Sequence, residues 1–349
     1  MKQADIFNQF SNLVLESYDS DKNAFWEAMM APFLGGNKLL SLWKHRKIGI
    51  HFLSLFKKSD DFRKAYLKEV SLSLGQDINH WRSLIEKDEY FTDAYPIYAF
   101  LVIWMYENHI NEPLNRYGDM LRSIMCGIAG YGILDVIVDC DQNFSPIELL
   151  TAQYLISQYE SGILNVFGVD SVNLSILHSI RSKYLKAEIK EKSLRFQSSP
   201  YQWDRPVECG YKAAHLLTPF MLSLKLIGKE SQIEQYFDVF FLFGAVIQIM
   251  DDLKDLEDDL KIGHYSYPTI HTDLLHMIKT QQTPAQIATT IINNKVHMRK
   301  VYDVCLNLIE QSRTILCNLN DPFLDRIVHV TLLRLKTAFS TQWNINIDD

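Results

Sequence analysis

The most informative part of this chain for its fold is Phe237–Pro268, with the sequence FDVFFLFGAVIQIMDDLKDLEDDLKIGHYSYP. Its first half is apolar nearly all round, as in a buried helix, and its second half is rich in aspartate. At 3.6 residues per turn, Asp251 and Asp255 fall on the same face as Phe240 upstream. The acids therefore continue a stripe that is apolar in the preceding turns, which predicts a core helix with a carboxylate cluster at its end.

This carboxylate cluster needs a compensating charge. Five aspartates within about 100° of a helix repel one another at spacings of three and four residues. A solvated acidic face, a basic partner helix or a metal ion could each relieve the repulsion. The emergence of the acids on an apolar face counts against a solvated face, and clustered carboxylate oxygens suit Mg²⁺.

A second acidic pair ends another apolar stripe, in the stretch Gly118–Pro146. Ser123–Leu134 carries no charge and contains several small residues that allow close helix approach, so it reads as buried. Asp135 and Asp139 follow at a spacing of four and share one helix face. Taken alone, the pair reads as the solvent end of a helix. Together with the first cluster, it predicts a functional site.

Helical periodicity extends over most of the remaining chain, and no segment alternates with the period of a strand. We therefore predict an all-α protein with one domain spanning residues 1–349. The expected helices include Leu149–Ile163, Ala213–Ile227, Ile233–Leu260, Ile287–Ile315 and Phe323–Phe339.

Bulk composition narrows the possible partners and location. The net charge of −7 argues against nucleic acid, which attracts basic patches. Five cysteines without a C-x-x-C pair indicate a reducing compartment. The N-terminal residues lack the apolar core of a signal peptide. The longest apolar run, Val239–Ile247, is far shorter than the ~20 residues that span a bilayer. We predict a cytoplasmic protein without a transmembrane segment.

The acidic helix resembles a known motif. Gln248, the pattern Asp251-Asp252-x-x-Asp255, and a later Gly263 are similar to the second aspartate-rich motif of the trans-prenyltransferases, a branch of the class I isoprenoid synthases. The resemblance implies a single large bundle of long antiparallel helices around a central apolar cavity. It also implies catalytic carboxylates here, with Asp251 and Asp255 binding Mg²⁺, Asp252 adjacent, and Gln248 on the substrate side.

Other site residues are predicted with less support from the pattern. By resemblance, Lys212 reaches the diphosphate, although an ordinary lysine at a helix start is an equal reading. Asp135-x-x-x-Asp139 is similar to the first motif of some terpene synthases, which implies that both residues are catalytic and bind Mg²⁺. Further candidates, chosen by position and charge or by their aromatic faces, are Arg195, Arg334, Tyr131 and Phe240.

We therefore predict a Mg²⁺-dependent terpene synthase that ionises a linear prenyl diphosphate, using two or three metal ions. No paired arginines follow Asp139, although elongating prenyltransferases carry them at this place, so a one-substrate reaction fits better. The alternatives are a trans-prenyltransferase that condenses isopentenyl diphosphate with an allylic diphosphate, and a non-catalytic helical partner subunit. The resemblance also implies a possible homodimer.

Overall fold

The structure is a computed structural model, and it describes residues 14–16, 18–19, 22, 102–108, 114–139, 146–195, 206–270 and 272–345. Helices account for 87% of the described residues, and none of these residues lies in a strand. The predicted all-α class is therefore confirmed for this part of the chain. The central cavity and the single domain stay predictions.

The described residues form two compact units. The first comprises the described residues up to His178 together with Thr218–Lys229, and the second comprises the other described residues. The long helices of the chain are α8 (Leu114–Asp139), α9 (Pro146–Phe167), α10 (Ser171–Arg195), α12 (Ile233–Lys254), α16 (Lys295–Leu319) and α17 (Pro322–Thr341). The shorter ones are η1 (Pro206–Leu217), α11 (Thr218–Leu226), η2 (Glu230–Gln232), α13 (Leu256–Lys261), η3 (Tyr267–Thr269), α14 (Leu274–Lys279) and α15 (Pro284–Asn293).

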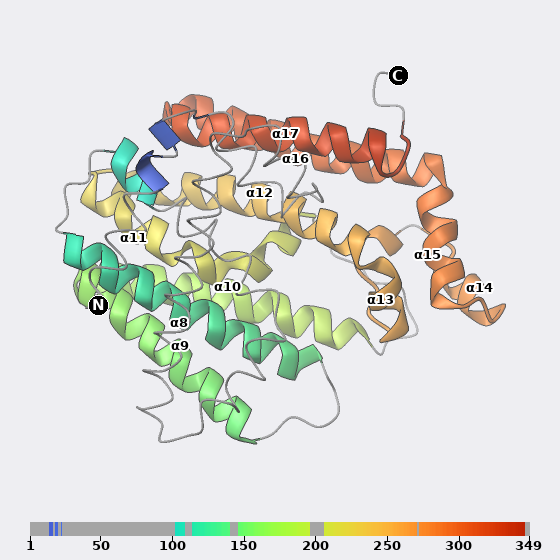
Figure 1. The fold of residues 1–349 in the computed structure, drawn as a ribbon, viewed down its shortest axis with the longest axis horizontal. Helices are drawn as coiled ribbons and strands as arrows, with labels where there is room; N and C mark the ends of the chain where they lie inside the picture. Colours follow the sequence, from blue (N-terminus) through green and yellow to red (C-terminus); the bar gives the residue numbers. More distant parts are fainter. Residues whose placement is uncertain are drawn as a thin grey trace. The chain divides into compact units, whose positions relative to one another are not determined.

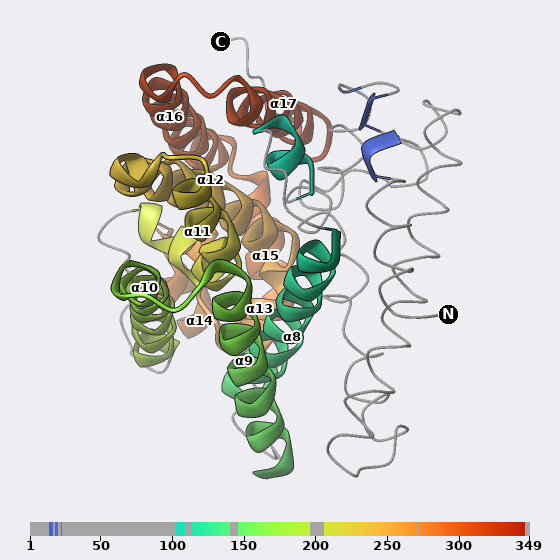
Figure 2. The same cartoon turned by 90° about the vertical axis from the view of Figure 1, so that its left-hand side faces the viewer.

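In the first unit, α8 and α9 pack along each other, as both views show (Figures 1 and 2). Small residues make the close crossing possible. A Cβ atom added to Gly127 would lie 2.8 Å from the ring of Tyr159, and one added to Gly130 would lie 2.8 Å from Cγ1 of Ile156. The prediction that this uncharged part of α8 is buried is confirmed.

In the second unit, α12 is the central core helix. It packs against η1 and α16, and α16 packs against α17 (Figures 1 and 2). The rings of Phe237 and Phe241 stack at 5.5 Å between centroids, and both side chains are almost fully buried. The buried Tyr236 hydroxyl donates a 2.8 Å hydrogen bond to Asp321, whose other carboxylate oxygen accepts from the Leu324 N–H at the start of α17.

The predicted continuous helix Ile233–Leu260 is interrupted at Asp255, where α12 ends and α13 begins. The interruption is slight, because the Asp255 N–H still donates to the Asp251 carbonyl and the Asp259 N–H to the Asp255 carbonyl. Gly263, at a φ of +73°, then ends α13. The His264 N–H donates to the Asp259 carbonyl at 2.8 Å, the bond that closes a helix end of this type.

Length and composition alone would allow one described helix, Glu230–Lys254, to cross a membrane. In the protein, 61% of its most apolar window is buried against other residues, as in a core helix. The uninterrupted apolar run Val239–Ile247 is short, but the helix is apolar over a longer part of its length than this run.

Gly210 allows η1 to approach α12 closely. A Cβ atom at this position would collide with the carbonyl oxygen of Phe241 and would lie 2.8 Å from the amide nitrogen of Ala245. Backbone atoms cannot swing aside as a flexible side chain can. The absence of a side chain at Gly210 therefore sets the distance between η1 and α12.

We expect Gly210→Ala to lower the free energy of unfolding by about 3 kcal/mol, because the new methyl group forces η1 and α12 apart. Gly244→Ala is the matched control on the opposite side of the crossing, where the added Cβ would lie 3.4 Å from the nearest atom, the Gly210 carbonyl oxygen. Its free energy of unfolding should stay within about 1 kcal/mol of the wild type. Urea unfolding followed by circular dichroism measures both, and equal stabilities would contradict this account of the crossing.

Candidate functional site

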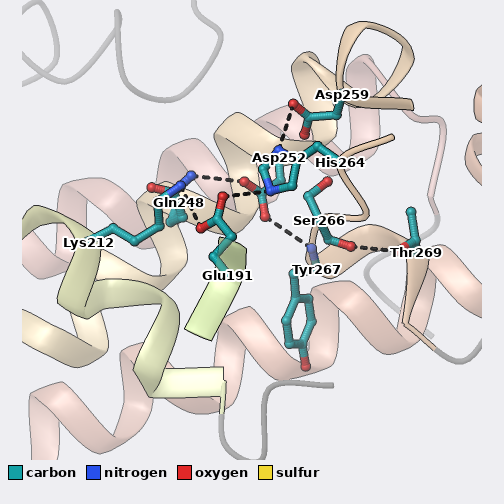
Figure 3. Close-up of polar contacts among 9 residues, drawn as sticks. All are labelled: Glu191, Lys212, Gln248, Asp252, Asp259, His264, Ser266, Tyr267 and Thr269. Carbon is teal, nitrogen blue, oxygen red and sulfur yellow. Dashed lines mark hydrogen bonds and ion pairs between the residues drawn. The ribbon is translucent and has the colours of Figure 1, made fainter. Parts of the chain in front are cut away.

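A recess lined by charged and polar side chains lies within the second unit. Its lining residues come from α10, η1, α12 and the segment after α13, and they are Glu191, Cys209, Lys212, Gln248, Asp252, His264 and Ser266. Figure 3 shows most of them with their polar contacts. The side chains of the recess pack closely and leave no room for a water molecule.

The carboxylate of Glu191 is the most deeply buried charge of the cluster, with 2% of its side chain exposed. One oxygen, Oε2, lies 2.9 Å from Nζ of Lys212, and the other, Oε1, lies 2.7 Å from Nε2 of His264 (Figure 3). Burial alone would raise the pKa of Glu191, but the positive charges of Lys212 and His264 lower it overall. Glu191 is therefore an anion that bridges two cations.

His264 is held between two carboxylates. Its Nε2 faces Glu191, and its Nδ1 lies 3.2 Å from Oδ1 of Asp259. Burial alone would lower the pKa of His264, but hydrogen bonds to Asp259 and Glu191 raise it to about 9. His264 is therefore positively charged at neutral pH.

Asp252 is buried on the α12 side of the recess, and both of its oxygens accept hydrogen bonds. The Gln248 amide donates at 2.9 Å and the backbone N–H of Tyr267 at 3.1 Å (Figure 3). Burial raises the pKa of Asp252 to about 7, against the opposing influence of Lys212 and Gln248. Near neutral pH this carboxyl group therefore exchanges readily between its charged and its protonated form.

Ser266 contributes a hydroxyl group to the recess. The residue is 2% exposed, and its Oγ has no hydrogen-bond partner among the described residues. A buried hydroxyl without a partner costs about 1–3 kcal/mol. A ligand atom that entered the recess could therefore relieve this penalty.

Asp251 and Asp255 lie outside the recess, at the exposed end of α12. The side chain of Asp251 is 54% exposed and lies 3.2 Å from Nζ of Lys254. Partial burial, together with the neighbouring negative charges of Asp251 and Asp259, raises the pKa of Asp255 to about 6. The repulsion predicted from the spacing is therefore present, and a cation would relieve it.

The carboxylates at the exposed end of α12 can be compared with the ligands that Mg²⁺ needs. Among the described residues, no three His, Cys, Asp or Glu side chains are grouped so as to hold a metal ion. Mg²⁺ usually needs only one or two carboxylates, with water and substrate phosphates completing its octahedron. Asp251 and Asp255 therefore fit such a role, whereas the Asp252 oxygens already accept protein hydrogen bonds.

The predicted residues of the first unit lie on α8. Asp135 is half-buried, and Asp139 is the last residue of the helix, with a side chain outside the described residues. Tyr131 is buried, and its ring contacts Tyr159 edge-on at 6.3 Å between centroids. The meeting of Asp135 with the α12 carboxylates stays a prediction.

The remaining candidates lie in the second unit. Lys212 was expected at a helix start, but it lies in the middle of η1, which begins at Pro206. Phe240 is buried on α12, and Arg334 is half-buried on α17 and does not line the recess. Arg195 ends α10, and its side chain lies outside the described residues.

Sequence reasoning missed Glu191 and His264. Glu191 lies in the charged run KAEIKEKSLR, which reads as a solvent-facing helix. His264 follows Gly263 in a loop, where no spacing marks it as a ligand. A usable signal was the position of Gly263, because a helix end at this glycine brings His264 back beside Asp259.

We expect His264 to make the stability of the protein depend on pH above neutrality. Its folded-state pKa of about 9 lies above the ordinary value of 6.5, so its stabilisation is complete below pH 6.5 and is lost as pH rises through 9. The wild type should lose roughly 2–3 kcal/mol over this interval relative to His264→Gln. Urea unfolding at both pH values tests this, with the exposed His276→Gln as control. Parallel curves for the wild type and His264→Gln would contradict it.

No family model, curated protein or solved structure matches this chain. The residues themselves are therefore the basis for inferring its function. Two groups of residues are informative: the exposed carboxylates Asp251 and Asp255, and the buried recess that holds Lys212, Gln248 and Asp252.

Proposed function

We propose that this protein is a Mg²⁺-dependent class I terpene synthase, which ionises a linear prenyl diphosphate to an allylic cation and gives a cyclic or linear terpene. One observation carries the proposal: Lys212 lines the same recess as Gln248 and Asp252. The resemblance pairs a lysine with the aspartate-rich motif across a long stretch of sequence. In the structure η1 packs directly against α12, which agrees with that pairing.

The chemistry divides between the end of α12 and the recess. Asp251 and Asp255 would hold the metal on the exposed end, and Mg²⁺ bound there would act as a Lewis acid toward the diphosphate oxygens. Lys212 would donate to the departing diphosphate from the side of η1. On α8, Asp135 and Asp139 would supply the second carboxylate pair.

Asp252 and Gln248 have a different role in this proposal. Their mutual hydrogen bond and the bond from the Tyr267 N–H fix the end of α12 against the segment that follows α13. Asp251 and Asp255 extend from that same helix end. Asp252 therefore orients the metal-binding carboxylates, and it does not take part in metal binding.

We expect Asp251→Asn and Asp255→Asn each to lower turnover about 100-fold or more, because each loses a negatively charged ligand for the cation. Asp258→Asn is the matched control in the same acidic run, since its side chain is 80% exposed and pairs with Lys261. Ten-, fifteen-, twenty- and twenty-five-carbon diphosphates should be supplied with Mg²⁺, and products identified by mass spectrometry.

The outcome of this assay separates the possible activities. Turnover of a single diphosphate that is retained in Asp258→Asn and lost in the other two variants supports the proposal. A product that requires isopentenyl diphosphate would identify a prenyltransferase instead. Absence of turnover and of Mg²⁺-dependent diphosphate binding in the wild type would favour a non-catalytic partner subunit.

The first unit makes its own prediction. We expect Asp135→Asn to lower turnover by about 100-fold or more while leaving helix content unchanged, because it removes one carboxylate of the second pair. Asp119→Asn serves as control, since Asp119 is an exposed residue of the same helix. Turnover and circular dichroism are measured for both variants. Equal turnover in both would remove α8 from the mechanism.

A further inference from the structure

Glu191 has one more cationic partner than is needed to neutralise its charge. One cationic partner would suffice to neutralise a buried carboxylate, yet its two oxygens each face a different cation, Lys212 at 2.9 Å and His264 at 2.7 Å. The partners come from different segments, η1 and the loop after α13. This arrangement allows one partner to leave while the carboxylate remains paired.

The two partners differ in how easily they can leave. His264 is fixed by a second carboxylate, because its Nδ1 faces Asp259 at 3.2 Å. Its backbone is also held, since the His264 N–H donates to the Asp259 carbonyl. Lys212 carries its charge on a flexible four-carbon chain, and its side chain is 18% exposed, compared with 10% for His264. Lys212 is therefore the partner that can move.

The closed recess, in which Glu191 holds Lys212, also contains a polar group that a ligand could satisfy. The Ser266 hydroxyl is buried and lacks a partner among the described residues, and it lines the recess with Lys212 and His264. Since the recess has no space for a water molecule, a partner can reach this hydroxyl only if a neighbouring side chain moves.

We propose that Lys212 exchanges between Glu191 and a bound diphosphate, and that Glu191 and His264 are positioning residues that make this exchange possible. In the closed state Glu191 holds Lys212. When a diphosphate takes the lysine, His264 continues to neutralise Glu191, so no buried charge is left unpaired. The inference rests on the proposed function, because it requires a diphosphate ligand.

If Lys212 exchanges in this way, substitutions of its partners should change the affinity for diphosphate in a pattern that a purely structural role would not give. Loss of His264 would leave Glu191 unpaired whenever Lys212 moves, so His264→Gln should weaken binding of inorganic diphosphate in Mg²⁺ by about tenfold or more. Removing the carboxylate as well, in Glu191→Gln/His264→Gln, should restore the affinity to within about threefold of the wild type, because no buried anion then holds the lysine.

A lysine variant completes the test. In a Lys212→Gln background the exchange cannot occur, so adding His264→Gln should change diphosphate affinity by less than about twofold. Asp259→Asn provides a second route if His264→Gln does not fold, since it weakens the hold on His264 without changing Glu191, and it should weaken binding in the same direction. Isothermal titration calorimetry of the full chain gives the affinities, and circular dichroism checks folding.

The measured affinities either support the exchange of Lys212 or contradict it. Weakening by His264→Gln, recovery in the double variant and no further effect in the Lys212→Gln background support the exchange. If the double variant binds more weakly than His264→Gln, the two residues are structural supports and the inference is overturned. If the wild type binds and turns over a prenyl diphosphate but His264→Gln binds normally, only the inference fails. If the wild type neither binds diphosphate nor shows turnover, the proposed function fails with it.

Discussion

The burial of a single charge, the Glu191 carboxylate, constrains how the surrounding segments of the second unit are placed. A carboxylate with 2% of its side chain exposed must be paired, since a buried charge without a partner costs several kcal/mol. The pairing needs Lys212 from η1 and His264 from the loop after α13 at the same place. The packing of η1 on α12 and the turn at Gly263 both serve that convergence.

At the end of α12, two adjacent aspartates lie in different environments. Asp251 faces solvent beside Lys254, whereas Asp252 points into the recess and accepts hydrogen bonds from Gln248 and Tyr267. A rotation of about 100° between neighbouring helix positions is enough for this separation. One carboxylate stays available to a cation, and the other attaches the helix end to the rest of the unit.

The charges of the recess are balanced without a ligand. Lys212 and His264 are offset by Glu191 and Asp259, and Asp252 has a pKa of about 7, so it can lose or gain a proton near neutrality. Such a cluster holds cationic donors in a dry environment, where their interactions are stronger than in water. That is the environment in which the departure of a diphosphate could be assisted, which is why we connect the recess to the proposed chemistry.

Helical periodicity is a local property, so the printed residues were sufficient to predict the all-α class, the buried character of α8 and α12 and the acids at the end of α12. It did not predict the separate helices α15 and α16 on either side of Asn294. The burial of Glu191 and its pairing with His264 become visible only in the folded protein. Their environment is created by segments far apart in the chain, and no local pattern records which side chains those segments bring together.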